Sequence, residues 1–183
     1  MIFFDLETTS LRAEEGILVA AGFIVKGEFK IFFTESPEKE KDTIEKTWEV
    51  FVENKDEEFV IWYSKFDIPF LVSRAIKYGL NISQIYEFKI IDICKLIQEN
   101  LKFGSNKLDE VAKFFGIEKV FELTGKDVHK LYLEFLSGNK SAKEKIIKHC
   151  EDDLRAMKEV FEKVKDYVPK WLEKNSKSKQ HFP

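Results

Sequence analysis

The chain has 183 residues, of which 44% are hydrophobic and 34% are charged, a composition typical of a globular protein. This length suggests one domain that can bury a substantial core, and 18 phenylalanines predict that the core is rich in phenylalanine. With 30 Lys and Arg against 33 Asp and Glu the net charge is −3, which excludes a strongly basic binder of polyanions, although bound divalent cations would change that sum.

The first part of the chain predicts three strands joined by short turns. Apolar runs occupy residues 1–6 (MIFFDL), 16–25 (GILVAAGFIV) and 28–34 (EFKIFFT), and Gly22 is expected to mark a β-bulge in the second run. Because strands that follow one another through tight turns pair in opposite directions, we expect an antiparallel meander.

Helical and strand patterns then alternate. We expect a helix over 41–54, a strand over 58–63, a helix over 67–80 and a strand over 88–93. The second of these helices is expected to begin with Asp67 as its N-cap, to carry Pro69 in its first turn and to stop at Gly79.

The remainder of the chain predicts helices over 106–116, over 127–138 and from 141 to about 167. The last helix opens with SAKE, in which Ser141 and Glu144 are expected to form a capping box. We place the domain at residues 1–168 and interpret residues 169–183, which are rich in lysine, as a basic and flexible tail.

An antiparallel start, a β-α-β-α middle and a helical C-terminal half predict an α/β fold in which helices cover a mixed sheet. Functional sites in such sheets form at the carboxyl ends of the strands. This rule directs attention to three acidic residues that end or follow predicted strands, namely Asp5, Asp67 and Asp92.

Cys94 and Cys150 are the only cysteines, and neither belongs to a CxxC motif. This count predicts neither a disulfide framework nor a zinc site, and it is typical of a reduced, intracellular protein. No apolar run is long enough to span a bilayer, and the N-terminus lacks the basic and apolar regions of a signal peptide. We therefore expect a cytoplasmic protein without a membrane segment.

Asp5 and Glu7 end the first predicted strand. Side chains alternate along a strand, so these two carboxylates point to the same side and repel each other. A divalent cation would compensate, because hard cations prefer carboxylate oxygens. An Asp-x-Glu pair also occurs by chance where a strand emerges into solvent, so the pair by itself does not define a site.

The last helix contributes more acidic residues, in the stretch KHCEDD. At about 100° per residue, five apolar residues share one face that we expect to be buried: Ile146, Cys150, Met157, Phe161 and Val164. His149 and Asp153 are four residues apart at the margin of that face and are candidates to enter a site. Glu151 and Asp152 point away from it and are expected to be solvated.

Three stretches carry a family resemblance. FDLETTSL at 4–11, YSKFDIPFL at 63–71 and HCEDD at 149–153 resemble, in this order and spacing, the three motifs of the DEDD superfamily of ribonuclease-H-like 3′–5′ exonucleases. The resemblance covers most of the chain, and NKLDEVAKFFGI at 106–117 is similar to the branch that includes the proofreading domains of B-family polymerases. It implies a mixed five-stranded sheet with three antiparallel and two parallel strands.

The resemblance also implies a site. Four carboxylates are implied ligands of two divalent cations, Mg²⁺ or Mn²⁺: Asp5, Glu7, Asp67 and Asp153. Asp5 is the implied bridging ligand, and Glu7 and His149 are the implied catalytic residues, with His149 holding or deprotonating the attacking water. Three residues are implied or candidate substrate contacts: Thr8, Leu11 and Phe66. For Phe66, core packing is the simpler role.

The chain departs from the family's pattern in two motifs. In the third motif one branch has Tyr-x-x-x-Asp and another has His-x-x-x-x-Asp, whereas here His149 stands at the tyrosine spacing and Leu154 occupies the position of the longer one. In the second motif, Tyr63 and Ser64 occupy a region where an Asn is often found. These departures leave the subfamily and the substrate open.

The resulting hypothesis is a metal-dependent 3′–5′ exonuclease that acts on single-stranded nucleic acid, with DNA slightly favoured over RNA. One alternative is a catalytically silent module that keeps the fold and binds nucleic acid, which the altered third motif favours. A haloacid-dehalogenase-type phosphatase ranks lower, because it needs a second Asp at the position of Glu7.

Overall fold

Five strands form one mixed sheet in the computed structural model, which describes residues 1–121 and 123–167. The strands are β1 (Ile2–Thr8), β2 (Leu18–Val25), β3 (Glu28–Phe33), β4 (Glu58–Ile61) and β5 (Lys89–Asp92), in the spatial order β3-β2-β1-β4-β5. The pairs β1–β2 and β2–β3 are antiparallel, whereas β1–β4 and β4–β5 are parallel. The expected sheet of three antiparallel and two parallel strands is therefore confirmed, with β1 at its centre.

The meander follows from a two-residue hairpin turn between β2 and β3. Lys26 and Gly27 both have positive φ, 53° and 89°, which is the backbone that a tight turn between twisted strands requires. The predicted bulge at Gly22 is wrong: Gly22 pairs regularly with Asp5, and the irregular register lies between Glu7 and Thr8.

Gly22 instead provides space for a helix. A Cβ atom at Gly22 would lie 2.4 Å from Cys150 Sγ and 2.8 Å from Leu154 Cδ1, closer than atoms can pack. Since Gly22 is the partner of Asp5 across the sheet, its missing side chain allows the last helix to lie against the strand that carries the acidic residues.

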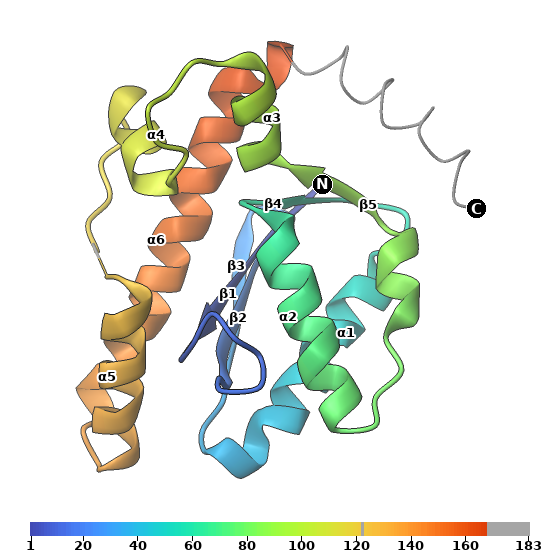
Figure 1. Cartoon of the computed structure of the whole chain (residues 1–183), viewed down its shortest axis with the longest axis vertical. Coiled ribbons are helices and arrows are strands. Elements are labelled where there is room, and N and C mark those ends of the chain that lie inside the picture. The colour runs from blue at the N-terminus through green and yellow to red at the C-terminus, as the bar shows by residue number, and fades with distance from the viewer. Residues whose placement is uncertain (122, 168–183) are drawn as a thin grey trace.

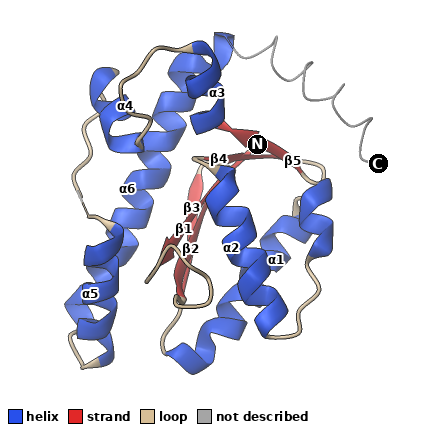
Figure 2. Ribbon diagram, in the orientation of Figure 1, coloured by secondary structure: helices blue, strands red, loops and turns tan. Residues whose placement is uncertain are grey.

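Six helices cover the sheet within the described ranges (Figures 1 and 2). They are α1 (Glu40–Glu53), α2 (Ser64–Lys77), α3 (Ile93–Asn100), α4 (Leu108–Phe114), α5 (Gly125–Leu136) and α6 (Lys140–Val164). Short 3-10 turns add η1 (Pro37–Lys39), η2 (Ser83–Glu87) and η3 (Lys165–Tyr167). Helices α1 and α2 pack on one face and α6 with α3, α4 and α5 on the other, so the expected α/β fold with a helical C-terminal half is confirmed.

The core between the sheet and helices α1 and α2 is rich in phenylalanine, as the composition predicts. Phe51 of α1 stacks on Phe59 with ring centroids 4.4 Å apart, and Phe4 stacks on Phe23 at 4.7 Å. Aromatic pairs at such distances contribute beyond the apolar area that they bury. Packing in this core fixes the position of α2 relative to the central strands of the sheet.

Two predicted helix starts are wrong. Helix α2 begins at Ser64 rather than at Asp67, so Asp67 lies inside the first turns of the helix and is not its N-cap. Helix α6 begins at Lys140, and the Ser141 hydroxyl donates to the Asn139 side chain instead of closing a capping box with Glu144. The expected stop of α2 near Gly79 is confirmed, since the helix ends at Lys77.

The predicted basic tail at 169–183 lies outside the described residues. Among the helices that are described, none is both long and apolar enough to cross a membrane.

Candidate active site

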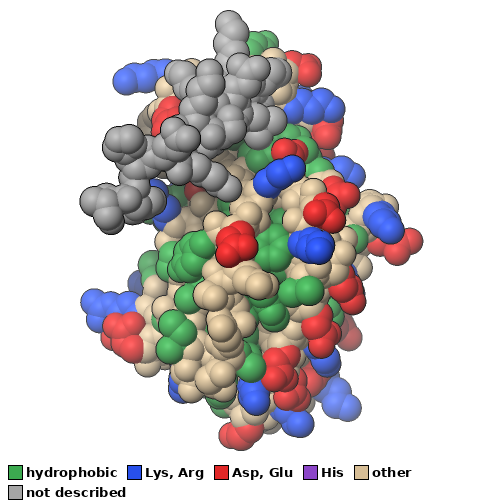
Figure 3. Space-filling model, turned by 90° about the vertical axis from the view of Figure 1, so that its right-hand side faces the viewer, with side chains coloured by type: hydrophobic (Ala, Val, Ile, Leu, Met, Phe, Trp, Pro, Cys, Tyr) green, Lys and Arg blue, Asp and Glu red, His purple; other side chains and the backbone are tan. Residues whose placement is uncertain are grey.

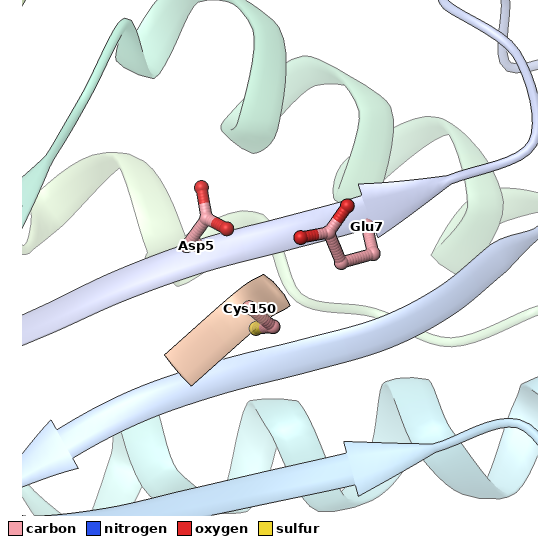
Figure 4. Close-up of side chains that lie close together, drawn as sticks. All are labelled: Asp5, Glu7 and Cys150. Carbon is pink, nitrogen blue, oxygen red and sulfur yellow. The ribbon is translucent and has the colours of Figure 1, made fainter. Parts of the chain in front are cut away.

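Asp5 and Glu7 point from β1 toward α6 (Figure 4). Phe3, two residues before Asp5, packs against Phe161 of α6, whereas Phe4 packs on the opposite face of the sheet. The alternation of side chains therefore places Phe3, Asp5 and Glu7 on the α6 side, as the sequence predicts. Asp5, Glu7 and the Cys150 thiol of α6 each offer an atom within 4.8 Å of the others.

Asp67 reaches the same place from α2. Because β4 runs parallel to β1 and beside it, the chain that leaves β4 enters α2 next to the carboxyl end of β1. Asp67 is 4% exposed, and its charge raises the pKa of Asp5. Asp153 of α6 approaches from the other side and raises the pKa of both Asp5 and Glu7. Asp67 and Asp153 are therefore near enough for their charges to act on Asp5, although the group that lies within 4.8 Å of one another consists of Asp5, Glu7 and Cys150.

The buried carboxylates repel one another, and a bound cation would offset that repulsion. Burial raises the pKa of Asp5, Glu7 and Asp67 well above their ordinary values, and for Asp5 and Glu7 the neighbouring carboxylates raise it further. Asp153 Oδ1 is paired with the Lys119 ammonium at 2.6 Å, and this one positive charge only partly offsets the rise in the pKa of Asp5 and Glu7. Carboxylate oxygens are the donors that Mg²⁺ and Mn²⁺ prefer, so these residues fit such ions.

His149 borders the acids from the preceding turn of α6. It is 5% exposed, its Nδ1 lies 3.1 Å from the Phe121 carbonyl oxygen and its Nε2 lies 3.7 Å from Glu7 Oε1. A carbonyl can only accept, so the neutral ring carries its proton on Nδ1 and presents a free Nε2 lone pair on the side of Glu7. This arrangement suits a group that accepts a proton within the site.

Cys150 is the unexpected neighbour of the acids. Its thiol is fully buried, and burial followed by the charges of Asp5 and Glu7 raises its pKa, so it remains a neutral thiol. A neutral thiol is a poor ligand for hard cations. Cys150 forms a wall of the site, as its place on the apolar face of the helix predicts.

Asp152 is not the solvated residue that the helical pattern predicts. It is 6% exposed, and its Oδ2 accepts hydrogen bonds from the Val120 and Phe121 amides at 2.7 and 3.0 Å. Its Oδ1 pairs with Arg155 Nη2 at 2.7 Å. The prediction failed because residues 117–121 cover this side of α6. The spacing of residues within the helix cannot reveal a contact with so distant a segment. Asp152 holds in place the carbonyl that orients His149.

Asp92, at the end of β5, anchors the helix that carries Asp67. Its Oδ2 accepts from the Ser64 amide and hydroxyl at 2.9 and 2.7 Å, and its Oδ1 accepts from the Lys95 amide at 2.9 Å. Tyr63, just before Ser64, has φ 73°, a strained value for a residue with a side chain. Asp92 therefore has a positioning role, and it also adds to the negative charge around Asp67.

Two of the three candidate substrate contacts lie together. Leu11, which is 80% exposed, and Phe66 line a groove of about 330 Å³ between the loop after β1 and the start of α2. Its other lining residues include Arg12, Lys65 and Phe70. Thr8 is buried and does not line the groove, but its hydroxyl donates to the Ser10 carbonyl at 3.0 Å and so shapes the same loop. The face seen in Figure 3 carries basic and acidic side chains interspersed with hydrophobic ones.

The fold and the site define an α/β domain built around an acidic centre at its middle strand. The chain belongs to the RNase H superfamily, whose family model matches residues 2–165. The family B DNA polymerase from the hyperthermophilic archaeon Pyrobaculum calidifontis is structurally similar, with a TM-score of 0.77 and 18% sequence identity over 91% of this chain. The chain spans 24% of that polymerase, so this likeness concerns the fold of one part of it. No curated protein matches the sequence significantly.

The stability of the metal-free protein should fall as pH rises. The pKa values of Asp5, Glu7 and Asp67 are raised by folding, so the folded chain holds protons that the unfolded chain releases. This contribution is complete below the ordinary values of 3.8 to 4.5 and is lost as pH rises through the raised values. Thermal melts in EDTA between about pH 5 and 8 measure it. Mg²⁺ should offset the loss, and a melting temperature that rises steadily over this range in EDTA would contradict the expectation.

Proposed function

We propose that the protein is a DEDD-type, metal-dependent 3′–5′ exonuclease that hydrolyses phosphodiester bonds of single-stranded nucleic acid, with DNA favoured over RNA. The proposal is supported by Asp5 and Glu7 side by side on β1, His149 beside Glu7, and the charges of Asp67 and Asp153 that raise the pKa of Asp5. Mutual repulsion makes such a set costly unless cations offset it. A module that only binds nucleic acid has no use for these acids.

In this proposal Asp5, Glu7, Asp67 and Asp153 hold two divalent cations, Mg²⁺ or Mn²⁺. When bound, such ions lower the pKa of a water molecule and offset the charge that develops on the phosphate and the leaving oxygen. His149 then accepts the proton of the attacking water at Nε2, while the Phe121 carbonyl fixes the ring through Nδ1–H. Glu7 Oε1 lies 3.7 Å from Nε2, and since both atoms accept hydrogen bonds, Glu7 contributes to holding the cations and not to orienting the ring.

We assign the substrate contacts to the groove between the loop after β1 and the start of α2, the helix that carries Asp67. Leu11 and Phe66 offer apolar surfaces for the terminal base, and Lys65 offers positive charge for a phosphate. Arg12 also lines the groove, where it pairs with Glu15 at 2.9 Å, and Glu14 adds a negative charge. The ring of Phe66 packs 5.5 Å from that of Phe70 but is only partly buried and lines the groove, so core packing and a base contact are compatible for this residue.

Digestion of a 5′-labelled single strand tests the proposal. In Mg²⁺ or Mn²⁺ we expect a ladder of products shortened from the 3′ end, slow attack on a blunt duplex, and no cleavage in EDTA. Matched DNA and RNA strands decide the substrate preference. Early release of the label as a mononucleotide would show digestion from the 5′ end and contradict the proposed direction. Tight binding of the strand without hydrolysis, in Mg²⁺ and in Mn²⁺, would instead establish a catalytically silent module that binds nucleic acid.

A further inference from the structure

Lys119 places a positive charge inside the acidic centre. Its side chain is 4% exposed, its Nζ lies 2.6 Å from Asp153 Oδ1, and it also contacts the carboxylate of Asp109 on α4. A lysine is rarely buried unless its charge is paired. No motif pointed to this residue, because it lies in the irregular segment after α4.

The backbone around Lys119 is fastened to α6, so the lysine side chain starts from a fixed point beside the acids, while its ammonium group can still change partners. The next two amides, of Val120 and Phe121, donate to Asp152, and the preceding carbonyl, of Glu118, accepts from Arg155. Arg155 itself forms ion pairs with Asp152 and Glu159. Lys119 is thus the side chain of this segment that faces the acids.

The two partners of Lys119 differ in their surroundings. The Asp153 side chain is 18% exposed and belongs to the acidic centre, whereas the Asp109 side chain is 49% exposed and lies outside it. A cation bound at Asp153 would lie close to the Lys119 ammonium, and like charges at such distances repel strongly. Asp109 offers the ammonium an alternative partner when that happens.

We propose that Lys119 is a built-in counter-ion that neutralises Asp153 in the metal-free protein and competes with the cation that Asp153 binds, withdrawing to Asp109 when that cation enters. The inference rests on the proposed metal site and adds a determinant of its affinity. The competition lowers the affinity of this cation position below the value that the carboxylates alone would give it.

Binding of Mn²⁺ to the full chain, measured by titration calorimetry without nucleic acid, tests the proposal. Lys119→Met keeps the length of the side chain and removes its charge. We expect it to tighten the binding of Mn²⁺ at Asp153 by about tenfold, since a repulsive neighbour is lost. In EDTA the same variant should melt several degrees lower than the wild type, and saturating Mn²⁺ should close that gap.

Matched controls separate this effect from net charge. Lys113→Met makes the same charge change at an exposed position of α4 and should leave Mn²⁺ binding unchanged. Asp109→Asn removes the alternative partner and should weaken the same Mn²⁺ position, whereas Glu110→Gln, an exposed neighbour on α4, should not. The Asp109 variant keeps the test valid if Lys119→Met fails to fold.

The outcomes also distinguish the two proposals. If the wild type binds no Mn²⁺, the proposed metal site is wrong, and with it the counter-ion role. If the wild type binds Mn²⁺ but Lys119→Met binds like Lys113→Met, or Asp109→Asn binds like Glu110→Gln, the metal site stands and the counter-ion inference is overturned.

Discussion

Replacing Asp5 by asparagine is expected to abolish metal-dependent cleavage and, at the same time, to stabilise the metal-free protein. Asp5 lies at the centre of the acids, where burial and the charges of Asp67 and Asp153 raise its pKa. A ligand lost from this position should cost more than about 10²-fold in rate, the upper range for losing a supporting partner of a metal. Relief of repulsion should raise the melting temperature in EDTA by roughly 2–4 °C, which corresponds to about 1 kcal/mol for a chain of this size.

The measurement pairs single-turnover digestion in Mg²⁺ with thermal melts in EDTA and in Mg²⁺. Asp56→Asn serves as the control, because Asp56 is exposed in the turn before β4 and its replacement makes the same charge change. The control should keep wild-type activity and stability. Retained activity in Asp5→Asn, or a lower melting temperature in EDTA, would show that Asp5 has a structural role rather than a role in a metal centre.

Replacing Asp152 by asparagine is expected mainly to lower stability, whereas replacing Asp153 by asparagine is expected to abolish activity. Asp153→Asn removes a charge from the acidic centre, so activity should fall to background while the fold is kept. Asp152→Asn weakens the hydrogen bonds that hold the Val120 and Phe121 amides, which should cost about 1–3 kcal/mol of stability. Because these bonds also position the carbonyl that orients His149, activity should fall by about tenfold rather than vanish.

Single-turnover rates and thermal melts of the two variants, compared at a temperature where both are folded, check this expectation. The pair forms its own control, since the substitutions are identical and one residue apart. If Asp152→Asn is inactive and Asp153→Asn is active, the assignment of the third motif to Asp153 is wrong. If both variants melt like the wild type, the contact between Asp152 and residues 120–121 contributes little in solution.

The spacing of apolar and polar residues along the sequence was sufficient to predict much of the fold. The alternation of a strand predicts that Asp5 and Glu7 share a side, and the apolar face of the last helix predicts that His149 and Asp153 border it, because both patterns depend only on residues close in the chain. The structure places these residues as expected. The order of strands and helices likewise predicts the mixed sheet.

The features that local periods do not reveal depend on contacts between distant segments. Asp67 is not an N-cap because the start of α2 is held by Asp92, which lies 28 residues from Ser64 in the chain. Asp152 is buried rather than solvated because Val120 and Phe121, about 30 residues before it, donate to its carboxylate. Lys119 reaches the acids from an irregular segment, which has no period to predict where its side chain points. Capping, burial and charge pairing are set by whichever segment packs nearby, and that packing exists only once the chain has folded.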